Sequence, residues 1–188
     1  MEPVKKSKYR FGVIRLLFMG LVVTGVIFTL VMIGVRMVKP DPAPVTVGGQ
    51  PPDFRLTTFS GEEIDTRNLR GKVVLINYWA SWCSTCDDEM EMLETAWQHY
   101  QSVNPEDVIF LGVAYMDTEP AAEAFLAEYG VTYPNGLDLQ GKISGIFQVT
   151  NVPETYVLDG EGRLQAVKIG PFLTVDQIYD MVDLALAE

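Results

Sequence analysis

The chain opens with a long apolar run that differs from every later segment. Its 20 residues, 16–35, contain no charged side chain. A helix of this length rises about 30 Å, which matches the hydrocarbon core of a bilayer. The run also lacks a polar face, so it does not fit a helix packed on one side of a soluble domain. This pattern predicts one transmembrane helix.

Beyond residue 50 the pattern changes to short strands that alternate with amphipathic helices. Val73–Trp79 and Val108–Tyr115 are rich in β-branched and aromatic residues, as central strands covered on both faces are. Phe54, Leu56 and Ile64 predict a short strand or a hairpin. The other predicted elements are helices from the cysteine pair to about 102 and over 119–129, 142–147 and 175–187, and strands over 155–158 and 163–169. This order predicts an α/β domain with a mixed central sheet flanked by helices.

The distribution of charge gives the apolar run an orientation. Seven of the fourteen basic residues lie in the first 39 positions, five before the run and two after it. The positive-inside rule therefore predicts a cytoplasmic N-terminus. Neither a small-residue cleavage site nor a lipid-accepting cysteine follows the run, which favours an uncleaved signal anchor over a secretory signal peptide. The domain is then expected on the extracytoplasmic (periplasmic) side of the cell membrane.

Three parts follow from these patterns. Residues 1–39 form the cytoplasmic N-terminus and the anchor, 40–50 a linker rich in Pro and Gly, and 51–188 the domain. Beyond residue 39 the chain carries 7 basic and 24 acidic residues, a net charge of −17. Such an acidic body repels nucleic acid, so nucleic-acid binding is excluded as a function class.

Both cysteines of the chain lie in Trp82-Cys83-Ser84-Thr85-Cys86. A disulfide across so small a loop restricts the unfolded chain little, which argues against a purely structural role. The spacing suits a reversible disulfide instead, in which one thiol attacks a partner's disulfide and the other resolves the mixed disulfide. Zinc binding would need two further ligands, and the only histidine, His99, falls late in the following helix. No metal or cofactor is expected.

The position of each thiol suggests its role. Cys83 follows a strand and is expected at the N-terminus of a helix, where the helix dipole stabilises a thiolate, so it is predicted to attack. Cys86 lies one turn later and is predicted to resolve. Glu89 follows on the same helix face, where it is either a proton-transfer group or part of a solvated acidic face. Pro153 either begins an edge strand or forms a cis peptide bond.

Two separated motifs resemble one family. The segment from Leu69 to Cys86, together with Pro52-Asp53-Phe54 and 151–160, resembles membrane-anchored thioredoxin-like thiol–disulfide oxidoreductases of the TlpA, ResA and CcmG (DsbE) types. The resemblance covers 51–188 and implies a thioredoxin-like fold. Ser84 departs from the family, in which proline or glutamate is common at this position.

The same resemblance implies roles for individual residues. Pro153 would be cis and stack beside the cysteine pair, and the backbone of Val152 would pair with a bound partner. Glu89 matches an active-site glutamate, and Asp117 falls near a second acidic position of the family. The predicted catalytic residues are Cys83, Cys86, Glu89 and Pro153, and the predicted partner-binding residues are Trp82, Val152 and Glu154.

The implied function is reduction of disulfides in apocytochrome c, or in its chaperones, during cytochrome c maturation. Electrons would come from a membrane-embedded thiol donor of the CcdA or DsbD type. Two alternatives stay open: a general extracytoplasmic protein-disulfide reductase, and a non-enzymatic module that binds partners through the same fold. A peroxidase fits paired thiols less well than dithiol exchange does.

Overall fold

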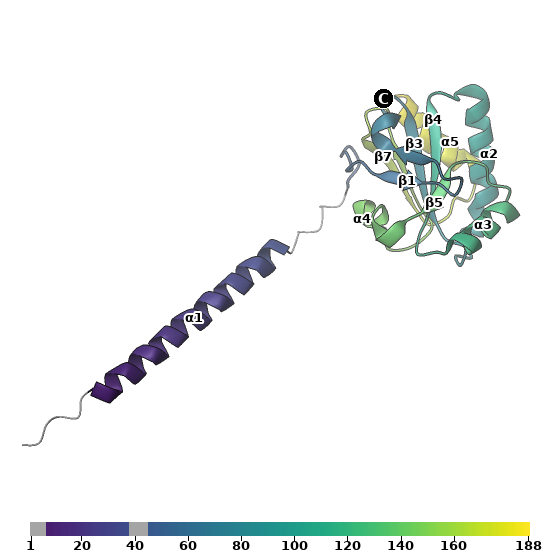
Figure 1. Cartoon of the computed structure of the whole chain (residues 1–188). Coiled ribbons are helices and arrows are strands. Elements are labelled where there is room, and N and C mark those ends of the chain that lie inside the picture. The colour runs from purple at the N-terminus through teal and green to yellow at the C-terminus, as the bar shows by residue number, and fades with distance from the viewer. Residues whose placement is uncertain (1–6, 38–44) are drawn as a thin grey trace, which may run out of the picture. The chain divides into compact units, whose positions relative to one another are not determined.

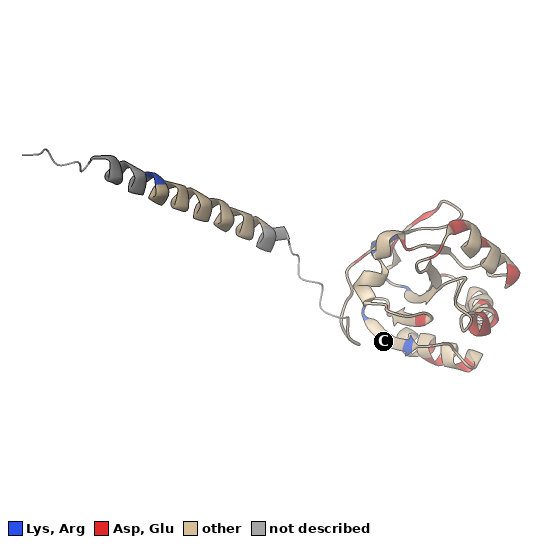
Figure 2. Cartoon of the chain, turned by 90° about the horizontal axis from the view of Figure 1, so that it is seen from below, with Lys and Arg blue, Asp and Glu red and all other residues tan. Residues whose placement is uncertain are grey.

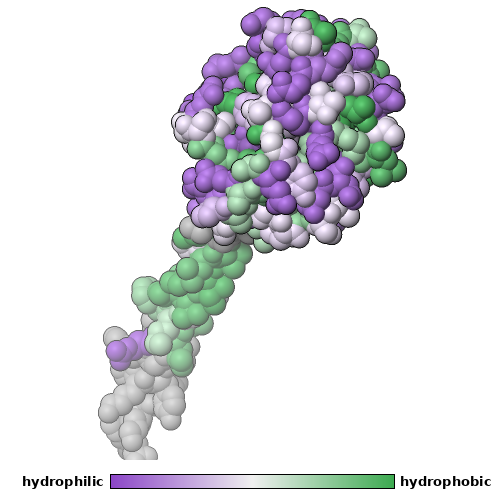
Figure 3. All heavy atoms as spheres, turned by 90° about the vertical axis from the view of Figure 1, so that its right-hand side faces the viewer, coloured by the Kyte–Doolittle hydropathy of each residue, from purple (hydrophilic) through white to green (hydrophobic). Residues whose placement is uncertain are grey.

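The computed structural model describes residues 7–37 and 45–188, with side chains described over 15–33 and 45–188. The chain divides into two units near residue 42, and each is treated by itself. The first contains helix α1 (Ser7–Met37), in which Arg15–Ile33 is long and apolar enough to cross a membrane. Its exposed side chains form a hydrophobic surface (Figure 3). Lys5, Lys6, Lys39 and 40–44 of the predicted linker lie outside the described residues.

The second unit is built on a five-stranded sheet with the order β5-β4-β3-β6-β7 (Figure 1). The strands are β3 (Val73–Trp79), β4 (Val108–Ala114), β5 (Asn135–Leu137), β6 (Glu154–Leu158) and β7 (Leu164–Ile169). Strands β3, β4 and β5 run parallel, whereas β6 is antiparallel to β3 and β7 is antiparallel to β6. The predicted mixed sheet is confirmed.

Helices and a small hairpin cover the two faces of this sheet. The helices are α2 (Asp87–Val103), α3 (Glu119–Glu128), α4 (Ser144–Phe147) and α5 (Val175–Leu186), with short 3-10 segments η1 (Thr66–Leu69) and η2 (Leu139–Gly141). A separate two-stranded sheet pairs β1 (Arg55–Thr57) with β2 (Glu63–Asp65). Of the strand or hairpin predicted at this position, the structure has the hairpin.

Each face of the sheet has its own hydrophobic core, which explains why β3 is apolar at nearly every position. Leu75 and Trp79 pack with the apolar side chains of α2, α3 and α5, whereas Ile76 and Tyr78 pack with those of the hairpin and α4. Successive side chains of a strand point to opposite faces, so a strand buried on both faces loses the usual alternation. Asn77 is the polar exception in this strand.

Two elements differ from the sequence expectation. Strand β5 was not predicted, because three residues, one of them Gly136, give too short a pattern to stand out. It is held by parallel pairing to the end of β4. Helix α2 begins at Asp87, after the cysteine pair, and Cys86 is its N-cap residue. Cys83 therefore lies in the turn that leads into the helix and not in its first turn.

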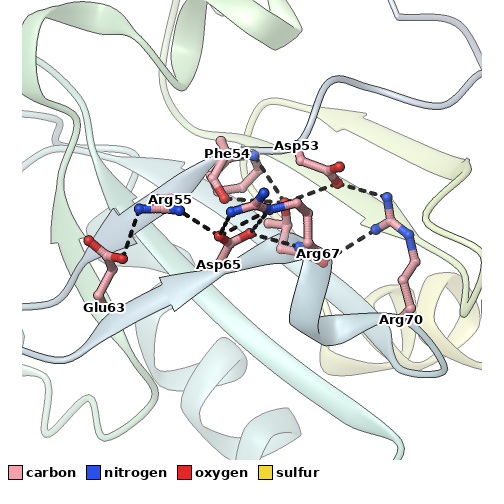
Figure 4. Close-up of polar contacts among 8 residues, drawn as sticks. Asp53, Phe54, Arg55, Glu63, Asp65, Arg67 and Arg70 are labelled. Atoms are coloured by element: carbon pink, nitrogen blue, oxygen red, sulfur yellow. Dashed lines mark hydrogen bonds and ion pairs between the residues drawn. The ribbon is translucent and has the colours of Figure 1, made fainter.

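Charged pairs stabilise the hairpin against η1 (Figure 4). Asp65 accepts hydrogen bonds from the guanidinium groups of Arg67 and Arg55, and these partners hold its pKa well below the usual range. Arg55 also reaches Glu63 across the hairpin at 3.2 Å. Arg70, just after η1, pairs with Asp53 at 2.7 Å. These pairs anchor the start of the domain beside the sheet.

The last part of the predicted linker is in contact with the domain. The N–H of Gly48 donates to the carbonyl oxygen of Leu164 at 2.7 Å. The N–H of Leu164 in turn donates to the carbonyl oxygen of Gly49 at 2.8 Å. Gln50 donates to the backbone of Glu161. Residues 48–50 are thus held along the start of β7, and a free tether could begin only before them.

Candidate active site

A disulfide joins Cys83 to Cys86 at the carboxyl end of β3. The intervening chain is a compact turn, because the N–H of Cys83 donates to Ala80 and the N–H of Cys86 donates to Cys83. Cys86 is fully buried, whereas Cys83 retains 6% exposure. The cysteine predicted to attack is therefore the less buried of the two, and the roles themselves stay a prediction. The structure shows the dithiol pair in its oxidised state.

Sheet pairing brings Pro153 to the same end of the sheet. Tyr78, near the end of β3, is in register with Glu154, the first residue of antiparallel β6. The residues just before β6 consequently lie beside those just after β3. The Val152–Pro153 peptide bond is cis, and the carbonyl oxygen of Val152 lies 3.5 Å from Cys83 Sγ. This is the neighbourhood that the resemblance implied.

The loop after β4 holds the turn that carries Trp82. Asp117 accepts hydrogen bonds from the N–H of Ser81 at 2.6 Å and from its hydroxyl at 2.9 Å. The indole N–H of Trp82 donates to the carbonyl oxygen of Met116 at 3.1 Å. Trp82, next to the cysteine pair, is still 59% exposed. An exposed tryptophan in a fixed orientation is well suited to contact a protein partner.

Glu89 is a buried carboxyl group one turn after Cys86. Its N–H donates to the carbonyl oxygen of Cys86, and its side chain has no exposed surface. Burial raises the pKa of Glu89 to about 7, and the hydrogen bonds from Phe172 and Asn77 offset part of that rise. A carboxyl group with this pKa can accept and release a proton near neutral pH.

Three residues that the sequence did not single out complete the surroundings of Glu89. The N–H of Phe172 donates to Oε2 at 2.9 Å, and the amide of Asn77 donates to Oε1 at 2.8 Å. The same amide nitrogen donates to the hydroxyl of Thr155 at 3.0 Å. One signal was present in the sequence: an asparagine inside an otherwise apolar buried strand needs a hydrogen-bond partner.

Glu154, a predicted partner-binding residue, has a buried side chain. Its carboxylate accepts a hydrogen bond from the hydroxyl of Tyr156 at 2.6 Å. The other oxygen lies 3.3 Å from the N–H of Asn151 and 3.4 Å from that of Thr150. The carboxylate thus fixes the backbone that leads to the cis bond, and the partner-binding role of Glu154 stays a prediction.

The stretch of chain that contains the cysteine pair is acidic. Between Lys72 and Lys142 the chain contains twelve Asp and Glu residues and no Lys or Arg. This stretch includes the active-site turn, α2 and α3. Figure 2 shows red segments on these helices and few blue ones in the domain. A partner that approaches the disulfide meets a negative potential.

The remaining candidates take no part in this arrangement. The ring of His99 packs against that of Tyr179 at 5.0 Å, on the α2 and α5 side of the domain. Within the described residues, no group of three or more His, Cys, Asp or Glu side chains is placed to bind a metal.

Comparison with known proteins agrees with this site. The model of the AhpC/TSA family matches residues 47–167. Over 179 residues the chain is 30% identical to the thiol-disulfide oxidoreductase ResA of Oceanobacillus iheyensis, covering 93% of this chain and 88% of the relative. It is 33% identical over 140 residues to the thioredoxin-like protein YneN of Bacillus subtilis, covering 73% and 79%.

A solved structure extends the likeness to the fold. A secreted Mycobacterium tuberculosis disulfide oxidoreductase homologous to Escherichia coli DsbE superposes with a TM-score of 0.60 at 25% identity, covering 69% of this chain and 94% of that one.

A thioredoxin-like sheet with a C-x-x-C disulfide at the end of its central strand defines a thiol–disulfide oxidoreductase. The chain belongs to the AhpC/TSA family and is an oxidoreductase of the ResA/DsbE type. A relationship of this kind implies protein thiols as clients.

Proposed function

We propose that the protein is a membrane-anchored reductant that delivers electrons to disulfides of apocytochrome c, or of its chaperones, during cytochrome c maturation. The observation that carries the proposal is the position of Cys83, which keeps 6% exposure and lies beside the exposed Trp82 and the carbonyl oxygen of Val152. The similarity to ResA supports this choice of pathway.

The proposed reaction is a two-electron exchange in two steps. The Cys83 thiolate attacks one sulfur of the client disulfide, forming a mixed disulfide and releasing the other client sulfur as a thiolate that takes up a proton. Cys86 then loses its proton and attacks Cys83 Sγ. The second client thiol leaves, and the Cys83–Cys86 disulfide forms. A membrane dithiol donor of the CcdA or DsbD type returns the two electrons by the reverse exchange.

Glu89 is proposed to receive the proton of Cys86 in the second step. It is the buried carboxyl group on the next turn of the same helix, and its pKa near 7 suits proton transfer at neutral pH. Glu154 is proposed to act indirectly, by holding the backbone before Pro153 in the conformation that a client would pair with.

The proposed location follows from α1. An apolar helix flanked by more basic residues on its N-terminal side supports an anchor with a cytoplasmic N-terminus and an extracytoplasmic domain. Protease added to intact spheroplasts should then degrade the domain. Protection of the domain until the membrane is permeabilised would reverse the proposed orientation.

Client trapping tests the function. In cells that make c-type cytochromes, a Cys86→Ser variant should retain its client on Cys83 as a mixed disulfide, because the resolving thiol is missing. Mass spectrometry after non-reducing isolation would identify the client. Cys83→Ser is the matched control and should capture none.

The outcomes separate the alternatives. Apocytochrome c or a haem-handling chaperone among the trapped proteins supports the maturation role. A broad set of unrelated proteins would instead favour a general reductase. Full cytochrome maturation by the Cys83→Ser, Cys86→Ser double variant would favour a non-enzymatic binding module. Peroxide consumption that depends on Cys83 and added thiol would favour a peroxidase.

A further inference from the structure

Asn77 has an arrangement that sheet packing alone does not require. It lies fully buried in β3, whose six other residues are apolar or aromatic and also buried. Both of its described side-chain contacts are made by the amide nitrogen, to Glu89 and to Thr155. Within the described residues its Oδ1 is the only buried side-chain polar atom without a hydrogen-bond partner.

That unpaired oxygen indicates which state of Glu89 the site favours. A carboxylate can only accept hydrogen bonds, so the amide must present its nitrogen to an ionised Glu89. A neutral carboxyl group would carry a proton that needs an acceptor. The Asn77 amide could present Oδ1 to this proton only if its oxygen and nitrogen exchanged positions. The NH₂ group would then lie where Oδ1 now lies, and it would have no hydrogen-bond acceptor there. These two hydrogen-bond contacts of the Asn77 amide therefore favour the carboxylate and work against the effect of burial.

The second donor acts in the same sense. The N–H of Phe172 donates to the other oxygen of Glu89, so both described side-chain partners of the carboxyl group are donors. Hydrogen bonds to the charged form of an acid oppose the effect of burial. The backbone donor of Phe172 can be removed only by a proline at that position, which would also change the backbone. Asn77 is the partner that a sequence change can remove.

We propose that Asn77 is a positioning residue of the exchange reaction, which holds Glu89 as a carboxylate and links it to Thr155 at the start of β6. Thr155 lies two residues after Pro153, in register with Asn77 across the sheet. One amide thus connects the proton-accepting group on α2 with the strand that borders the client path. The catalytic consequence rests on the proposed role of Glu89, whereas the effect on Glu89 itself does not.

Other charged or titratable groups face Glu89 from the neighbouring elements. Lys168 on β7 favours the carboxylate through its positive charge. Tyr133, before β5, is buried nearby and donates its hydroxyl to the sulfur of Met90. Cys86, on the preceding turn, is in the disulfide here and does not titrate in this state. Of these groups, only the cysteine changes its titration during turnover.

The first test measures Glu89 directly. The full chain in detergent, in its disulfide form and labelled with ¹³C at the glutamate carboxyl carbons, is titrated by NMR. Glu89→Gln identifies the resonance. We expect a pKa near 7 in the parent chain and a value about one pH unit higher in Asn77→Leu, a tenfold change in the ratio of carboxylate to acid. A pKa unchanged within about 0.3 units would overturn the proposal.

Asn135→Leu is the matched control. Asn135 is also a buried asparagine in the sheet, but its contacts are to the indole N–H of Trp79 and the carbonyl oxygen of Tyr133. An equal shift of the Glu89 pKa in this control would also overturn the proposal. Should Asn77→Leu not fold, Asn77→Ser must show the same upward shift, because a serine hydroxyl is too short to replace the amide.

The second test separates positioning from structure. The pH profile of the reduced protein is recorded with insulin disulfides as the probe, in the parent and Glu89→Gln backgrounds. In the parent background, Asn77→Leu should move the Glu89-dependent inflection of the rate against pH upward by about one pH unit. In the Glu89→Gln background, the same substitution should cause no such shift. The same loss of rate in both backgrounds would make Asn77 merely structural. A shifted NMR pKa with an unmoved profile would keep the link to Glu89 but reject its proton-transfer role.

Discussion

The carbonyl oxygen of Val152 lies 3.5 Å from the sulfur of Cys83. The cysteine turn and the segment before Pro153 therefore meet at the carboxyl end of β3. They are 69 residues apart in the chain and are joined by the antiparallel pairing of β3 with β6. A client sulfur that reaches Cys83 therefore also reaches the backbone before Pro153.

Asp117→Ala should loosen the active-site turn. The substitution removes the acceptor of three hydrogen bonds, two from Ser81 and one from the N–H of Thr118. The side chain is partly exposed, so water replaces some of them, and we expect a loss of about 1–2 kcal/mol in the free energy of unfolding. Urea denaturation measures this loss.

The Asp117→Ala substitution should also affect the reaction. The rate of disulfide exchange should fall as well, because Ser81 precedes Trp82 and Cys83 in the turn. Asp180→Ala, an exposed aspartate on α5, should change stability by less than about 0.5 kcal/mol. Equal stability of the Asp117 variant and the parent would show that the loop does not brace the turn.

Glu89 should make stability depend on pH in an unusual direction. Its pKa is about 7 in the folded chain against an ordinary value of 4.5, so between these values the folded state binds more protons than the unfolded state. The contribution of Glu89 is fully present below about pH 4.5 and is lost as the pH rises through 7. The difference of 2.5 units corresponds to roughly 3 kcal/mol.

Denaturation of the disulfide form across this pH range tests the Glu89 effect. The Glu89→Gln side chain cannot ionise. Between pH 4.5 and 7 the free energy of unfolding of this variant, relative to that of the parent, should therefore rise by roughly 3 kcal/mol. A change in stability that the amide causes equally at every pH does not alter this difference. Glu91→Gln, at an exposed position of the same helix, is the matched control. Parallel curves for the parent and Glu89→Gln would contradict the raised pKa.

The sequence was sufficient for the sheet and for the thiols, but not for the contacts that surround them. The runs at Val73–Trp79 and 108–115 predict β3 and β4 because burial on both faces leaves few polar positions. The C-x-x-C spacing identifies the redox pair by its chemistry, and the resemblance adds Pro153. These features are local or belong to a motif.

The contacts that the sequence could not provide connect residues far apart in the chain. Asp117 reaches Ser81 across 36 positions, and Asn77 reaches Thr155 across 78. Strand β5 depends on pairing with β4, because three residues have too little intrinsic preference. The inward orientation of Glu154 also depends on tertiary packing, since a glutamate is usually exposed.

Trp82→Ala should weaken client binding more than folding. The ring is largely exposed, so its removal creates no core cavity, and we expect a stability loss below about 1 kcal/mol. For a protein client, we expect the ratio kcat/KM to fall roughly tenfold, as for loss of an aromatic contact at an interface. Exchange with oxidised glutathione, which is too small to cover the ring, should fall much less.

Trp97→Ala is the contrasting control, because this ring packs in the core at 5.7 Å from that of Phe110. It should cost about 3 kcal/mol or more in stability. A Trp82 variant whose rates with the protein client and with glutathione fall by the same factor would indicate damage to the cysteine turn and not to a docking surface.

The acidic surroundings of the cysteine pair should make exchange depend on salt. With no Lys or Arg between residues 72 and 142, a basic client is attracted toward the site and an acidic one is repelled. Raising the ionic strength from about 0.05 M to about 0.5 M shortens the screening length from more than 10 Å to a few ångströms. For a basic disulfide peptide, we expect the second-order rate to fall roughly tenfold over this range.

A charge-reversed pair of variants distinguishes this attraction from a general salt effect. Asp88→Lys with Glu91→Lys places two positive charges on exposed positions of α2 close to the cysteines. This double variant should slow exchange with the basic peptide, accelerate exchange with an acidic one and reduce both salt slopes. The same two changes at Asp176 and Asp180, on α5, should have a smaller effect. If both peptides react with the same salt slope in the parent chain, the acidic stretch does not select clients.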